Sequence, residues 1–161
     1  MNFNNFSYNH LNHLQIGRIG EYWAKLCFTL NGFETYHCDV DDKGIDFVLR
    51  VNETRYIDIQ VKTIRENTKY VFVSKKTWKN KLRENLYLIV VLISNNKIPE
   101  LFFIPSKEFE NTNELFRDRN YNKSKGQTSK PEWGLNISKK NMHLLEEFKI
   151  EKMKHKIIAN H

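Results

Sequence analysis

The chain contains an uninterrupted apolar run, Leu86–Ile93 (LYLIVVLI). This run is far too short to span a bilayer as a helix. A strand that is apolar on both faces has to be covered on both, so the run predicts a central strand of a sheet with other elements packed on each side. The chain of 161 residues shows no internal repeat and no long linker, and we expect a single domain over residues 1–161.

The elements around this strand are typical of a mixed α/β domain. A helix is expected over residues 11–31, ending at Gly32. Strands are expected over residues 35–38, 45–51, 56–63, 70–73 and 100–104, a short basic helix over 75–84, a loop over 111–131, and a last helix from about residue 138 with a frayed tail after Met153. Residues 52–54 form the expected turn of a hairpin. This order predicts a central mixed sheet flanked by helices.

The first expected helix carries an acid on a stripe that should face the sheet. The stripe consists of Leu14, Gly17, Glu21, Ala24 and Phe28, spaced by three and four residues. A carboxylate on a buried stripe needs a partner. Taken alone, the pattern favours an ion pair between Glu21 and a basic side chain over a functional role.

Two neighbouring strands also carry polar residues. In the segment 56–63 (YIDIQVKT), Asp58, Gln60 and Lys62 share one face, and apolar residues occupy the other. Such alternation alone indicates no more than a half-exposed strand. Asp46, however, begins a strand that is otherwise apolar, where an unpaired carboxylate is costly to bury. A metal ion or Lys62 would stabilise this carboxylate, and local hydrogen bonds at the strand entrance are the alternative.

In combination, these residues resemble the signature of the PD-(D/E)XK nuclease superfamily. The signature places an Asp on one strand and D/E/Q-x-K on the next, often with a Glu on the preceding helix; the matching residues are Glu21, Gly44-Ile45-Asp46 and Gln60-Val61-Lys62. The resemblance covers residues 14–104 and extends to Gln-containing restriction enzymes of the Mrr type and a group of predicted nucleases. It implies a restriction-endonuclease-like α/β fold with an αβββαβ core.

The resemblance also implies a metal-dependent chemistry. Asp46, the Gln60 amide oxygen, the Val61 backbone carbonyl and Glu21 would bind Mg²⁺, with Mn²⁺ as a substitute, and Lys62 would orient the attacking water. The expected activity is hydrolysis of phosphodiester bonds, with DNA as the substrate. Gln60 replaces the usual acid and removes a negative charge from the site. Two alternatives therefore stay open, namely a nucleic-acid-binding module without catalysis and a domain in which these polar residues merely pair.

The charge distribution is consistent with a nucleic acid partner. The chain has a net charge of +7, and bases outnumber acids in residues 62–83 and 117–130. A basic surplus suits a polyanion, although it equally serves solubility. We expect phosphate contacts from Lys75, Lys76, Lys79, Lys123 and Lys125. Aromatic residues in or beside these blocks could stack on bases, namely Tyr70, Trp78, Tyr121 and Trp133.

Other features bear on location and assembly. The only cysteines, Cys27 and Cys38, form no CxxC motif, so a disulfide framework is not expected. The N-terminal residues 1–10 lack the charged region and apolar run of a secretory signal. We therefore expect a soluble cytoplasmic protein without a membrane partner. Nucleases of this fold often pair to cut two strands, so the resemblance also implies a homodimer as one arrangement.

Overall fold

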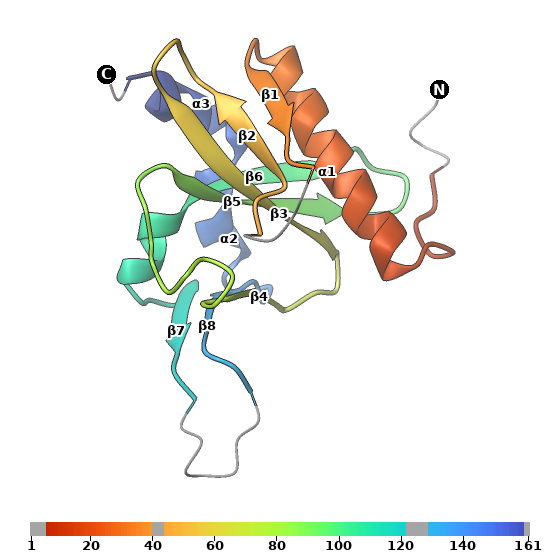
Figure 1. Cartoon of the computed structure of the whole chain (residues 1–161). Coiled ribbons are helices and arrows are strands. Elements are labelled where there is room, and N and C mark those ends of the chain that lie inside the picture. Colours follow the sequence, from red (N-terminus) through yellow and green to blue (C-terminus); the bar gives the residue numbers. More distant parts are fainter. Residues whose placement is uncertain (1–5, 40–43, 122–128, 160–161) are drawn as a thin grey trace.

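The structure is a computed structural model that describes residues 6–39, 44–121 and 129–159 (Figure 1). Its large sheet has five strands in the order β1-β2-β3-β5-β6. The strands β3 and β5 are parallel and all other neighbours are antiparallel. The bounds are β1 Glu34–His37, β2 Phe47–Arg50, β3 Tyr56–Arg65, β5 Leu86–Ile93 and β6 Glu100–Pro105. The expected mixed sheet and the hairpin between β2 and β3 are confirmed.

A small antiparallel sheet, in the order β4-β8-β7, packs against the large one. Its strands are β4 Tyr70–Ser74, β7 Phe116–Arg119 and β8 Glu132–Asn136. The helical elements are α1 His13–Leu30, the 3-10 helix η2 Ser106–Glu110, α2 Met142–Leu145, the 3-10 helix η4 Glu146–Phe148 and α3 Ile150–Ala159. In Figure 1, β7 and β8 extend away from the body of the molecule. Within the described residues, no helix combines the length and apolar character needed to cross a membrane.

Two hydrophobic cores lie on opposite faces of the large sheet. One is shared with α1 and α3, and Ile89 and Val91 of β5 point into it. The other is shared with the small sheet, and Leu88 and Val90 of β5 point into that one. The central strand β5 is therefore covered on both faces, as its uninterrupted apolar sequence predicts.

The buried stripe of α1 is shifted from the predicted one. The helix starts at Asn12, whose side chain forms a reciprocal capping box with Gln15. Its buried residues include Ala24 and Phe28, as expected, but they continue through Gly20 and not through Leu14, which is 71% exposed. A Cβ on Gly20 would overlap the side chain of Thr63 in β3. The absence of a side chain at this position thus lets α1 lie directly on the large sheet.

Three further expectations about elements are wrong. Residues 75–84 form a series of turns and not a helix, and Lys79 and Asn80 have positive φ angles of 52° and 55°. Trp78 inserts into the core from these turns and is 2% exposed, which holds the segment in its irregular path. The segment 111–131 contains β7. The C-terminal helix α3 continues to Ala159 because its apolar side chains, such as Ile157, pack into the core.

Candidate active site

The candidate site lies where β2 begins beside β3. β2 pairs only with residues 56–59 of β3, which continues to Arg65 with β5 as its partner. At this point the Asp46 N–H donates to the Ile59 carbonyl at 2.8 Å, and Asp46 Oδ2 accepts a hydrogen bond from the Val61 N–H at 2.5 Å. The Asp46 carboxylate therefore takes the place of a strand neighbour. We call this region, residues 44–46 and 60–62, the β2–β3 notch.

Gln60 contributes a buried amide to the notch. Its residue is 7% exposed, and its Oε1 has no hydrogen-bond partner among the described residues. Gly44 adopts a positive φ of 64°, and a Cβ built there would lie 2.8 Å from Gln60 Nε2. Gly44 thus permits the chain before Asp46 to pass close to this amide. A buried carbonyl oxygen without a donor is costly, and a hard cation would satisfy it, so the donor set fits Mg²⁺.

Lys62 follows on the same face of β3 as Gln60. The faces are set by the packing, because Ile59 and Val61 contact the core under α1 whereas Ile64 contacts the opposite core. Lys62 is half-buried, and none of the described carboxylates forms an ion pair with it. Its ammonium is therefore a cation beside the notch that no described acid neutralises.

Glu21 lies on the flank of α1 that faces β2. Gly20 points directly at Thr63 of β3, and the indole of Trp23, on one flank, donates to the Pro99 carbonyl at 3.1 Å, next to β6. Because successive helical residues are 100° apart, Glu21 projects from the other flank, toward the side of β3 that carries the notch. Its side chain is 24% exposed and accepts a hydrogen bond from Arg18 at 3.0 Å.

The ion pair with Arg18 is the arrangement that the helix pattern by itself favours. The structure therefore places Gln60 and Lys62 on one face of β3 beside Asp46, whereas Glu21 belongs to α1, which packs on the other face of the sheet, and is held by Arg18. The described residues contain no group of three or more His, Cys, Asp and Glu side chains that could hold a metal ion. An ion at the notch would thus depend on amide and backbone oxygens in addition to carboxylates.

Comparisons with known proteins bear on the fold. No protein-family model matches the chain, and a search of curated proteins finds no significant match. The solved structure of the bacterial homing endonuclease I-Ssp6803I is similar, with a TM-score of 0.55 and 14% identity over 92% of each chain. The chain has a restriction-endonuclease-like fold. Hjc, a Holliday junction resolvase from Archaeoglobus fulgidus, reaches a TM-score of 0.46 at 14% identity, covering 74% of this chain and 83% of its own.

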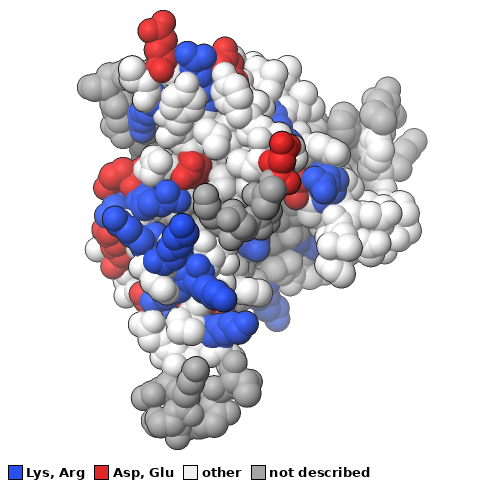
Figure 2. Space-filling model, in the orientation of Figure 1, with Lys and Arg blue, Asp and Glu red and all other residues white. Residues whose placement is uncertain are grey.

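On this restriction-endonuclease-like fold, basic side chains gather beside the notch. Figure 2 shows Lys and Arg concentrated over the turns that follow β4 and over the start of the β7–β8 arm. Lys76 and Lys79 are exposed there, and their expected phosphate contacts stay a prediction. A Cβ on Gly44 would overlap the methyl group of Thr77, so these basic turns contact the chain just before Asp46. Nothing in the sequence singles out Thr77, because its contact arises only when the chain folds.

Lys75 does not belong to this exposed surface. It is 8% exposed, donates to Asp118 at 2.5 Å and to Asn120 at 2.9 Å, and lies 5.1 Å from the ring centre of Trp133. The structure thus corrects the expectation of a phosphate contact, because the Lys75 ammonium is buried and already pairs with Asp118. Lys123 and Lys125 lie outside the described residues.

The aromatic residues of the basic blocks are also placed differently from the expectation. Trp78 and Trp133 are buried in the core, with ring centres 5.6 Å apart, and cannot stack on bases. Tyr70 and Tyr121 donate hydrogen bonds to the same oxygen of Glu132, at 3.0 and 3.2 Å. The apolar part of these blocks therefore stabilises the small sheet.

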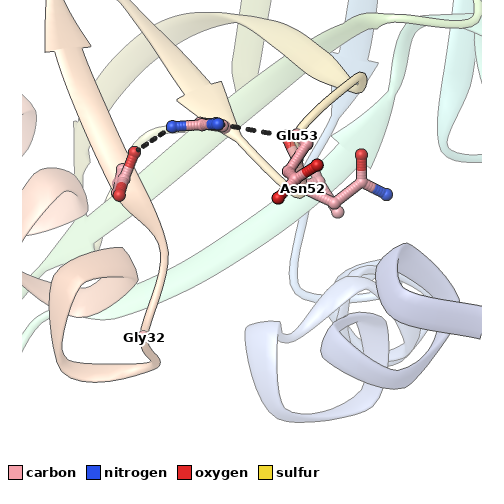
Figure 3. A pocket seen from close by; sticks show the side chains of 6 residues that line it. Gly32, Asn52 and Glu53 are labelled. Carbon is pink, nitrogen blue, oxygen red and sulfur yellow. Dashed lines mark hydrogen bonds and ion pairs between the residues drawn. The ribbon is translucent and has the colours of Figure 1, made fainter.

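A hollow at the opposite end of β2 is not part of the notch. It has a volume of about 270 Å³ and lies beside the β2–β3 hairpin (Figure 3). The Arg50 guanidinium bridges it, pairing with Glu34 at 3.1 Å and donating to the Asn52 carbonyl at 3.2 Å. Arg50 and Glu34 in this hollow thus neutralise each other.

Proposed function

We propose that this protein is a metal-dependent nuclease that hydrolyses phosphodiester bonds in DNA. The observation that carries the proposal is the buried Gln60 Oε1, which has no hydrogen-bond partner among the described residues. Gln60 precedes Lys62 on the same face of β3, and the Val61 N–H between them donates to the Asp46 carboxylate, in a restriction-endonuclease-like fold. An oxygen in this state is destabilising unless something binds it. We therefore expect a ligand, such as a metal ion, to bind this amide oxygen in the functional protein.

The residues at the notch have two proposed roles, namely binding of the metal ion and orientation of the attacking water. Asp46, the Gln60 amide oxygen, the Val61 carbonyl and Glu21 would hold Mg²⁺, with Mn²⁺ as a substitute. When bound, the ion offsets the charge of the phosphate and acidifies a water molecule. Lys62 orients the attacking water and stabilises the negative charge that develops during attack. Because Gln60 is neutral, we expect weaker metal binding than a second strand carboxylate would give.

The exposed basic turns would position the substrate. Lys76 and Lys79 flank Thr77, which contacts Gly44 at the entrance to the notch. Phosphate contacts from such lysines hold the backbone without reading sequence. A duplex or strand bound there would present a phosphodiester to Lys62.

A nucleic-acid-binding module without catalysis is the second candidate. The Arg18–Glu21 ion pair favours it, because a guanidinium at 3.0 Å competes with a metal ion for that carboxylate. An exposed pair of this kind contributes little stability, so an ion could displace it. The two candidates are therefore separable only by measuring cleavage.

Cleavage of supercoiled plasmid with Mg²⁺ separates the candidates. Wild type should nick or linearise the plasmid, Asp46→Asn and Lys62→Met should not, and Asp58→Asn should behave as wild type. Asp58 is the matched control because it lies on the same face of β3 but pairs with Arg83 at 3.0 Å. Retardation of the plasmid without cutting would support the binding module, and the absence of both would refute the nuclease and the binder together.

The number of domains, the cellular location and the oligomeric state remain proposals. We propose that residues 1–161 form one folding unit, which is supported by two cores that share the large sheet. Location in the cytoplasm and pairing as a homodimer stay predictions from the sequence.

A further inference from the structure

A pocket of about 500 Å³ lies at the carboxyl ends of the parallel strands β3 and β5. Its floor is apolar and consists of Ile64, Leu92, Ile137 and Met142. Ile64 and Leu92 are direct neighbours across the two strands. The carboxyl ends of parallel strands are common ligand sites, and this volume is within the range of small-molecule pockets. The pocket is separate from the β2–β3 notch.

The rim of the pocket carries more positive than negative charge. Its two acids are already neutralised, since Glu66 pairs with Lys97 at 3.7 Å and Glu100 pairs with Lys149 at 2.9 Å. Two other lysines of the rim have no ion-pair partner among the described residues: Lys69 and Lys139. The Ile137 N–H donates to the Lys69 carbonyl at 2.9 Å. Because Lys139 follows Ile137 by two residues, Lys69 and Lys139 belong to neighbouring segments of the rim. The pocket thus combines an apolar floor with cations at its edge.

We propose that this pocket binds a nucleotide, with the base against the apolar floor and the phosphate at Lys69 and Lys139. The apolar floor can pack against a planar base, and the two lysines can pair with the attached phosphate, so a nucleotide fits both parts of the pocket. The pocket also lies close to the notch, because Ile64 follows Lys62 on the same face of β3 at a distance of about 7 Å along the strand. This separation is within the span of one nucleotide.

Two sources could supply this nucleotide. One is an unpaired residue of the nucleic acid strand beside the phosphate held at the notch, and this source rests on the proposed function. The other is a free mononucleotide, which needs no nuclease activity. Both share the chemistry of a base with a phosphate.

Methyl-resolved NMR of the full chain without added metal tests the pocket itself. Each of the four deoxynucleoside 5′-monophosphates is titrated, and inorganic phosphate serves as the comparison. We expect at least one mononucleotide to shift the methyl signals of Ile64, Leu92, Ile137 and Met142, whereas phosphate alone leaves them in place. The proposal is overturned if none of the four mononucleotides moves these signals.

Matched lysine variants test the rim. The double variant Lys69→Ser, Lys139→Ser should weaken mononucleotide binding roughly five- to tenfold, because two exposed charge contacts are lost. Lys140→Ser is the control, since Lys140 is adjacent and exposed but pairs with Glu114 at 3.7 Å and does not line the pocket. Equal affinity in the double variant and wild type would contradict the proposed phosphate site.

A short single-stranded DNA oligonucleotide distinguishes the sources. If it shifts the same methyl signals, the nucleotide belongs to the substrate strand; if only mononucleotides shift them, the ligand is free. Both results support a nucleotide pocket. Because the titrations contain no metal, they remain valid if plasmid cleavage fails, so failure of the proposed function and failure of the pocket are separate results.

Discussion

Replacement of Gln60 by methionine should stabilise the metal-free protein. Gln60 is 7% exposed, and its Oε1 lacks a partner among the described residues. A buried polar atom in this state costs about 1–3 kcal/mol. Methionine has a similar length, adapts to irregular spaces and needs no hydrogen bond. We therefore expect Gln60→Met to raise the free energy of unfolding in EDTA by about 1–2 kcal/mol.

Divalent metal should reduce this difference in stability by about 1 kcal/mol. For a dissociation constant of about 1 mM, roughly 10 mM Mg²⁺ adds about 1.4 kcal/mol to the wild type. If the variant binds about tenfold more weakly, it gains only about 0.4 kcal/mol. Urea denaturation with and without Mg²⁺ measures both values. The reasoning is refuted if Gln60→Met is less stable than wild type in EDTA, or if both proteins gain equally from Mg²⁺.

Three further substitutions or reactions test other parts of the structure. Lys75→Met should cost about 1–2 kcal/mol of stability, because it removes the ion pair with Asp118 and the hydrogen bond to Asn120, whereas exposed Lys76→Met should stay within about 0.5 kcal/mol in the same urea titration. Gly44→Ala should lower both stability and plasmid cleavage, since the added Cβ overlaps a neighbouring side chain at a positive φ; normal activity with normal stability would contradict the close packing. Burial, with a contribution from Glu151, raises the pKa of the Cys27 thiol to about 11, so its reaction with a disulfide reagent near pH 8 should be roughly two hundredfold slower than that of an ordinary thiol.

The sequence predicts the central elements because their patterns are local. The apolar run of β5 predicts that both of its faces are buried, and this is confirmed. The alternation of β3 correctly predicts burial of Ile57 and Ile59, but Gln60 on the polar face is buried as well. The phase of α1 is less certain from sequence, because Gly20 carries no hydrophobic signal although it makes the closest approach to the sheet. Leu14 fits the apolar stripe of the sequence but is 71% exposed in the structure.

The surface around the site depends on contacts that sequence patterns do not encode. Lys75 and Lys76 look alike in sequence, yet Lys75 is buried and pairs with Asp118 of β7, whereas Lys76 is exposed. Trp78 likewise turns a segment with helical composition into a set of turns, because its ring is drawn into the core. The order and spacing of Asp46 and Gln60-Val61-Lys62 predict that they lie on adjoining strands, and the hydrogen bond from the Val61 N–H to Asp46 is consistent with this.

Titration of Mn²⁺ followed by electron paramagnetic resonance tests most directly whether the β2–β3 notch holds a divalent ion. The free ion gives a strong signal that decreases on binding, so the measurement does not require cleavage. We predict one bound Mn²⁺ in the wild type and in Asp58→Asn, and loss of this binding in Asp46→Asn. Equal binding by all three proteins, or no binding by the wild type, would contradict the account.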